Sequence, residues 1–171
     1  MEYTRINIKQ ISDDEEKETI TRMILESLPD WFGIPEAREE YIAESKDKPF
    51  FCALDGETAV GFLYLKETGR HTVELAVMGV RKEYHRKGIG GALFDAAKKE
   101  AKKQGYSFIQ VKTVQMGKYA EYDDTNRFYL SLWDSKSWRS FRLCGMNGIR
   151  VKFTSWPFEK PTEGITPILV V

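Results

Sequence analysis

The segment from Val80 to Leu93 has the clearest chemical potential, because a basic, glycine-rich turn there joins an apolar stretch to an amphipathic one. An α-helix leaves the N–H groups of its first turn unpaired and carries partial positive charge at that end, so both features bind an anion. Glycines let a ligand approach the backbone, and basic side chains add full charges beside the amides. The turn therefore predicts a phosphate-binding site formed by Arg86, Lys87, Gly88, Ile89, Gly90 and Gly91.

In its wider context the turn resembles motif A of the GNAT superfamily of N-acetyltransferases, whose members move acetyl from acetyl-CoA to an amine. The family signature is Gln or Arg, two residues, Gly, one residue, then Gly or Ala, and the chain reads His85-Arg86-Lys87-Gly88-Ile89-Gly90. His85 departs from the first position but still offers a hydrogen-bond donor. The flanking elements and a later Phe-Tyr pair follow the family order. The alternative is an ordinary strand-to-helix turn with a solvated basic face.

Apolar periodicity predicts the elements that position this turn. Strands are expected over 5–11, 50–54, 58–66, 72–80 and 108–114, and helices over 14–28, 36–45 and 88–104, with a short helix through 126–129. This order, β-α-α-β-β-β-α-β-α, is that of the GNAT fold. The resemblance thus implies an α/β (α+β) fold with a mixed central sheet, in a single domain spanning 1–171.

Local signals predict where several elements begin and end. Ser12 has the spacing of a capping box before an acidic first turn, and Asp55-Gly56 favours a hairpin turn. Gly105 is placed to end the third helix, and Asp123-Asp124 to cap the last one. Gly79, inside a strand, indicates a bulge or a close backbone approach.

The resemblance implies that acetyl-CoA is the cosubstrate. Its pantetheine arm is expected between the strand before the phosphate turn and the strand after the following helix. Backbone groups of Met78 and Val80 are expected to bond the arm in the manner of an added strand. His85 and the turn residues given above complete the predicted cofactor site.

Two side chains are candidates for acid–base chemistry. A protonated amine must lose a proton before it attacks a carbonyl, and Glu74 stands at the spacing from Gly88 that the base glutamate has in related histone acetyltransferases. The alternatives for Glu74 are a solvent-facing residue, pairing with a nearby cation, or a water relay in its place. Phe128-Tyr129 matches the family's Phe-Tyr pair, which makes Tyr129 the candidate acid for the departing CoA thiolate; the alternative is a buried structural tyrosine. The Asn that often stands seven residues earlier is replaced by Tyr122.

Acceptor recognition is expected in the segment between the first two helices. Trp31 and Phe32 can form an apolar wall, and nearby Glu36, Glu39 and Glu40 can attract a cation. Aromatic residues in such a position also serve as ordinary core residues. The sequence does not identify the amine.

Composition is that of an ordinary soluble globular protein: 171 residues, 42% hydrophobic and 30% charged, with 26 basic and 26 acidic residues. With no net field, neither a nucleic-acid nor a membrane partner is expected. Cys52 and Cys144 have no metal-ligand spacing, so neither a metal site nor a disulfide framework is expected. The absence of an apolar targeting core predicts a cytoplasmic protein. The expected partners are acetyl-CoA and an amine acceptor, with a homodimer as a possible assembly.

The tail over 132–171 is atypical. Small bacterial GNAT proteins follow Phe-Tyr with two residues and Leu-Gly-Phe, then two final strands, whereas this chain continues Leu130-Ser131-Leu132-Trp133-Asp134. Trp133 is encoded by TGG and Asp134 begins with GA, so the frame that groups the last base of codon 132 with TG reads Leu, Met or Val and then forces the glycine codon GGA. The shifted frame further on permits a segment that resembles the family's C-terminus. We therefore hypothesise a frameshift, which predicts the loss of the usual final hairpin.

The function expected from these residues is direct transfer of acetyl to a primary amine of a small molecule or peptide. A catalytically weak acyl-CoA-binding module or sensor is the main rival, and the altered tail favours it. Nucleotide or nucleic-acid binding through the basic patch from Arg81 to Lys103 is a third reading, but the chain lacks a P-loop ending, a Rossmann acidic partner and an aromatic RNA platform.

Overall fold

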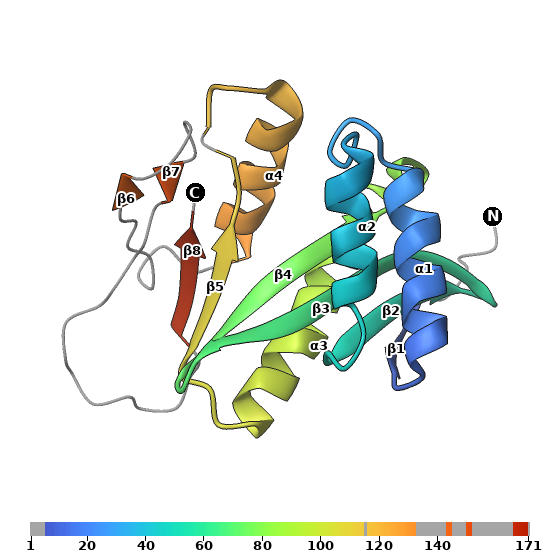
Figure 1. The fold of residues 1–171 in the computed structure, drawn as a ribbon, viewed down its shortest axis with the longest axis horizontal. Helices are drawn as coiled ribbons and strands as arrows, with labels where there is room; N and C mark the ends of the chain where they lie inside the picture. The colour runs from blue at the N-terminus through green and yellow to red at the C-terminus, as the bar shows by residue number, and fades with distance from the viewer. Residues whose placement is uncertain (1–5, 115, 133–142, 145–149, 152–165, 171) are drawn as a thin grey trace. The chain divides into compact units, whose positions relative to one another are not determined.

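The computed structural model describes residues 6–114, 116–132, 143–144, 150–151 and 166–170. Its strands form a mixed six-stranded sheet in the order β1-β2-β3-β4-β5-β8 and a separate pair, β6-β7 (Figure 1). The helices are α1 (Asp14–Glu26), α2 (Pro35–Glu44), a 3-10 turn η1 (Lys82–Tyr84), α3 (Ile89–Lys103) and α4 (Ala120–Ser131). The strands are β1 (Asn7–Ile11), β2 (Phe50–Asp55), β3 (Thr58–Gly69), β4 (Thr72–Val80), β5 (Phe108–Lys112), β6 (Leu143–Cys144), β7 (Arg150–Val151) and β8 (Thr166–Val170).

The predicted element order is confirmed, with boundaries that shift by a few residues. The chain divides into two compact units, one of Met1–Lys66 with Ala76–Glu100 and one of Glu67–Leu75 with Ala101–Val171. The first contains the phosphate turn and the second contains Glu74 and Tyr129. Each is described in turn.

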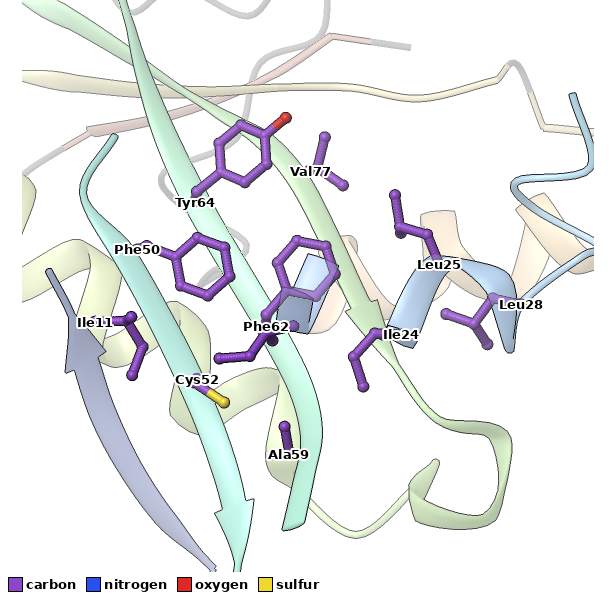
Figure 2. Close-up of a cluster of buried hydrophobic side chains, with 11 residues drawn as sticks. Ile11, Ile24, Leu25, Leu28, Phe50, Cys52, Ala59, Phe62, Tyr64 and Val77 are labelled. Atoms are coloured by element: carbon purple, nitrogen blue, oxygen red, sulfur yellow. The ribbon is translucent and has the colours of Figure 1, made fainter. Parts of the chain in front are cut away.

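The core of the first unit lies between α1 and the antiparallel strands β1, β2 and β3. Alternate residues of β2 and β3 face α1, as the two-residue period of a strand requires, and the Phe50 and Phe62 rings stack with centroids 5.3 Å apart (Figure 2). Ile20, Ile24 and Leu25 of α1, and Leu28 shortly after its end, also belong to this cluster. The helix is therefore held by its apolar face rather than by intrinsic propensity.

The start of α1 corrects the predicted cap by one residue. Asp13, not Ser12, is the N-cap, and its carboxylate accepts a 2.8 Å hydrogen bond from the N–H of Glu16. The acidic first turn is present as expected and complements the helix dipole.

Gly79 is required by helix packing. A Cβ at this position would lie 2.9 Å from a methyl carbon of Ile24 and 3.2 Å from Leu28. The close approach predicted for Gly79 is thus between β4 and α1. On the opposite face of the sheet lies α3 (Figure 1), whose Leu93 contacts the Cβ position of Gly61. Gly105, at φ 85°, follows α3 as predicted and donates its N–H to Lys102.

In the second unit β5 is paired in parallel on both sides. Thr72–Leu75 of β4 pair with Phe108–Val111, and β8 pairs along Phe108–Lys112. The start of α4 differs from the prediction: Tyr119 is the N-cap, and Asp123 instead accepts a 2.7 Å hydrogen bond from the N–H of Gly117. Most of the tail lies outside the described residues; its described segments are the short antiparallel pair β6-β7 and the strand β8.

Candidate active site

The phosphate turn in the first unit leaves a row of backbone donors. Gly88 has φ 78°, in the left-handed region that glycine adopts without strain, and no atom lies within 4 Å of where its Cβ would be. The first hydrogen bond of α3 runs from the N–H of Ala92 to the carbonyl of Gly88, at 3.0 Å. The amides of Ile89, Gly90 and Gly91 therefore precede the helical ladder and can donate to an anion.

Of the cations of the turn, most contact neighbouring side chains. Lys82 pairs with Asp30 and lies over the Trp31 ring, and Lys87 lies 4.8 Å from the ring centroid of Tyr84. Arg86 is different: it is exposed, has φ 60°, and forms no ion pair or hydrogen bond within the described ranges. Its guanidinium is therefore the charge of this turn most available to a phosphate.

The ring of Tyr84 is held in place by Asp55. Its hydroxyl donates a 2.8 Å hydrogen bond to the Asp55 carboxylate, which raises the pKa of the phenol. This contact joins the turn to the end of β2, so η1 is fixed from outside the turn itself.

His85 stands where the family has Gln or Arg, and its side chain forms a hydrogen bond within the protein. Its Nε2 lies 2.6 Å from the carbonyl of Val80 and must carry the proton, because a carbonyl only accepts. The same ring packs edge to face with Trp31, with centroids 5.8 Å apart. His85 thus bonds the carbonyl of Val80, one of the two residues whose backbone is predicted to bond the pantetheine arm.

The two aromatic residues predicted to meet the acceptor have different surroundings. Both are half-buried and pack against the α1 cluster, but Trp31 also lies beside His85 and Lys82 of the turn, whereas Phe32 packs edge to face with Tyr41, 6.0 Å away. Glu39, one of the acids proposed to attract a cation, already forms a two-pronged ion pair with Arg22 at 2.6 and 2.7 Å. In this segment, Trp31 and Phe32 both stay candidates for acceptor contact, and Trp31 is the one that contacts the turn.

Glu74, in the second unit, lies in a charged cluster with two residues of β5. It stands opposite Gln110 in the parallel register, and its Oε2 accepts hydrogen bonds from Gln110 Nε2 at 3.0 Å and from Lys112 Nζ at 2.7 Å. The Glu74 side chain is 9% exposed and that of Lys112 is 55% exposed. The pairing with a nearby cation, one of the alternatives considered from the sequence, is therefore present.

Tyr129 is buried on α4, and this burial raises the pKa of its phenol. The hydroxyl therefore keeps its proton well beyond neutral pH. Three residues earlier, buried Asn126 donates from Nδ2 to the carbonyls of Val114, at 2.9 Å, and Tyr122, at 2.8 Å. These bonds tie the helix of Tyr129 to the chain that follows β5.

Sequence reasoning missed three residues of these clusters: Gln110, Lys112 and Asn126. The signal for Gln110 and Lys112 was their shared face on a strand expected beside that of Glu74, but the register was not predictable. Asn126 carried only the signal of an amide one helical turn before the candidate acid.

Other groups in the described part of the chain add little chemistry. Burial raises the pKa of the Cys52 thiol to about 12, so it is a weak nucleophile. No set of three or more His, Cys, Asp or Glu side chains in the described ranges could hold a metal ion. None of the described helices combines the length and apolar character needed to cross a bilayer.

Comparison with known proteins defines the class to which this fold and turn belong. The profile of the Acetyltransferase (GNAT) family matches residues 17–132, so the chain belongs to that family. The match ends where the tail begins to depart from the family pattern. No curated protein matches the chain at a significant level.

Solved structures of GNAT proteins share the fold. The PaiA N-acetyltransferase of Thermoplasma acidophilum, solved in complex with coenzyme A, has a TM-score of 0.62 at 21% identity, with 86% of this chain and 96% of that chain covered. A putative GNAT acetyltransferase of Desulfovibrio desulfuricans has a TM-score of 0.64 at 18% identity, with coverages of 81% and 89%. An aminoglycoside acetyltransferase from an uncultured soil sample, solved with sisomicin, has a TM-score of 0.58 at 19% identity, with coverages of 76% and 88%.

Proposed function

We propose that the chain transfers the acetyl group of acetyl-CoA to a primary amine of a small molecule or peptide by direct attack. The observation that carries the proposal is the turn before α3, where left-handed Gly88, the amides of Ile89, Gly90 and Gly91 and the exposed Arg86 suit a pyrophosphate. The solved complex of the PaiA protein with coenzyme A supports the choice of cofactor. His85 would act by holding the turn to Val80 rather than by binding phosphate through Nε2.

The cofactor arm is proposed to follow β4 beyond the part that pairs with β5. The parallel register ends at Leu75 and Val111, whereas β4 continues to Val80. Backbone groups of Met78 and Val80 are then candidates to bond the pantetheine amides in the manner of an added strand.

Glu74 and Tyr129 would share the proton transfers. Acetyl-CoA supplies a thioester whose C–S bond breaks as the C–N bond to the amine forms. Glu74 takes the proton that the ammonium must lose, directly or through a water molecule, and Tyr129 gives its proton to the CoA thiolate. The burial that raises the pKa of Tyr129 keeps this proton available at neutral pH.

The direct test is release of CoA thiol from acetyl-CoA in the presence of a panel of amines, with mass spectrometry of the product. Thiol release that requires an amine and yields its N-acetyl derivative is the expected result, and Glu74→Gln should lower kcat/KM for the best amine by about a hundredfold. Tight acetyl-CoA binding without any amine-dependent turnover would contradict the enzymatic proposal.

A catalytically weak acyl-CoA-binding module is a second candidate, and it is favoured by the end of the family match at residue 132. If the atypical tail results from a frameshift, the gene around codons 128 to 135 should encode a Leu-Gly-Phe continuation in another frame. Restoring that continuation should then raise turnover in the amine panel. The absence of such a continuation in every frame would refute the frameshift hypothesis.

A further inference from the structure

The pair formed by Glu74 and Lys112 has unused hydrogen-bonding capacity on both members. Both Gln110 and Lys112 donate to Oε2 of Glu74, and no described residue donates to its Oε1. An ammonium group has three N–H donors, and within the described ranges only one bond from Lys112 is present. An open anionic acceptor and open cationic donors therefore stand side by side.

The two groups differ in their access to solvent. The carboxylate of Glu74 is almost enclosed, whereas more than half of the Lys112 side chain is exposed. A ligand that reaches Glu74 therefore meets the charge of Lys112 as well. A second uncompensated cation so close to Lys112 is repelled, because like charges held together outside bulk water interact strongly.

We propose that the natural acceptor is an amine that also carries a carboxylate, with its ammonium group on Oε1 of Glu74 and its carboxylate on Lys112. This inference rests on the proposed function, in which Glu74 receives the proton of the acceptor. The ammonium of such a zwitterion pairs with the carboxylate of Glu74, and its carboxylate pairs with the ammonium of Lys112. No charge of the complex is then left without a partner. A polyamine or an aminoglycoside would instead add positive charge beside Lys112.

The test compares acceptors of one length that differ only in their far end: 4-aminobutyrate, 1-aminobutane and 1,4-diaminobutane. With the full chain and acetyl-CoA, kcat/KM should be highest for 4-aminobutyrate and lowest for the diamine, with about a tenfold or larger ratio between them. The difference should lie mainly in the KM of the amine. A wild-type preference for the diamine would overturn the inference without any variant being needed.

Variants at position 112 sharpen the test. Lys112→Met should reduce the ratio to near unity, Lys112→Arg should preserve it, and Lys112→Glu should invert it in favour of the diamine. Lys102→Met, which removes an exposed lysine from the end of α3 in the same unit, is the matched control and should leave the ratio unchanged.

The experiment distinguishes a wrong assignment of Lys112 from a wrong proposed function. One outcome is that the amines are acetylated with a 4-aminobutyrate to diamine ratio of kcat/KM that is the same in Lys112→Met as in the wild type. That result would overturn the assignment of Lys112 and leave the proposed function intact. No thiol release with any of the three amines, or with the wider panel, would overturn the proposed function and this inference with it. Should Lys112→Met fail to fold, the ratios of Lys112→Arg and Lys112→Glu decide the question.

Discussion

The chain passes from strand to helix at two junctions that follow parallel strands, and their polar groups are used in opposite ways. Between β4 and α3 the backbone takes left-handed values at Arg86 and Gly88, and the first amides of the helix precede its first hydrogen bond. Between β5 and α4 the N–H of Gly117 is bonded to Asp123, and buried Asn126 bonds the carbonyls of Val114 and Tyr122.

The two junctions differ in whether their backbone donors are left open or are bonded within the protein. The α3 junction has no acidic residue in its first turn and carries an exposed Arg86, so its donors favour an incoming anion. The α4 junction has Glu121 and Asp123 in its first turn, and these acids already complement the helix dipole. The comparison is consistent with the proposed roles, phosphate binding at the α3 junction and positioning of Tyr129 at the α4 junction.

Gly90→Val should produce the largest effect, by placing a branched side chain where the backbone must approach the pyrophosphate. Loss of two or more charge-assisted hydrogen bonds corresponds to about 4 kcal/mol, or roughly a thousandfold weaker acetyl-CoA binding by calorimetry. Gly69→Val, at a position where no atom lies within 4 Å of the Cβ site, is the control. Unchanged affinity in a folded Gly90→Val protein would reject the assignment of this junction.

Tyr129→Phe should lower kcat by about a hundredfold with little change in acetyl-CoA affinity. A general acid typically contributes about a hundredfold to ten-thousandfold, and a thiolate is a tolerable leaving group even unassisted, so the expected loss lies at the lower end of that range.

The pH dependence of the parent enzyme tests the same assignment, because the protonated phenol of Tyr129 is the active form. Because burial raises its pKa, activity that depends on it should persist through pH 10, the ordinary pKa of tyrosine, and be lost only at higher pH. Steady-state rates across pH give the measurement. A wild-type kcat throughout would end this assignment, and the substitution should also be made in a version with a family-like tail if the parent is inactive.

Asn126→Ala should destabilise the protein by about 2 kcal/mol, since it removes two part-buried hydrogen bonds from its side chain to backbone carbonyls. Its acetyl-CoA affinity should change little. Denaturant unfolding gives the free energy, and Thr125→Ala, on the exposed face of α4, should stay within about 0.5 kcal/mol of the parent. A large loss of affinity at unchanged stability would show that the α4 junction also binds the cofactor.

Arg86→Gln should have a small effect, about a fivefold loss of acetyl-CoA affinity that diminishes at high salt. Lys82→Gln should reduce acetyl-CoA affinity even less, because Asp30 already neutralises Lys82. Titrations at two salt concentrations compare the variants. The opposite ranking would show that Lys82 leaves Asp30 to meet the phosphates.

The sequence by itself was sufficient to place the glycine-rich turn before α3 and to give the order of elements. These features depend on local rules: glycine at left-handed positions, period-2 and period-3.6 apolar patterns, and Gly105 after a helix. Local signals failed at the start of α1, where Ser12 and Asp13 both offer a capping side chain, and at the start of α4, where Tyr119 is the N-cap without a side-chain hydrogen bond.

Tertiary structure alone decided how the candidate groups are paired. The register between β4 and β5 places Gln110 and Lys112 on Glu74, and the path of the turn places His85 between Val80 and Trp31. Such contacts join residues far apart in the chain, and a shift of one residue in a strand would turn every side chain to the other face. The chain therefore determined which chemistry is present, while packing between distant segments determined which charges and hydrogen bonds that chemistry can use.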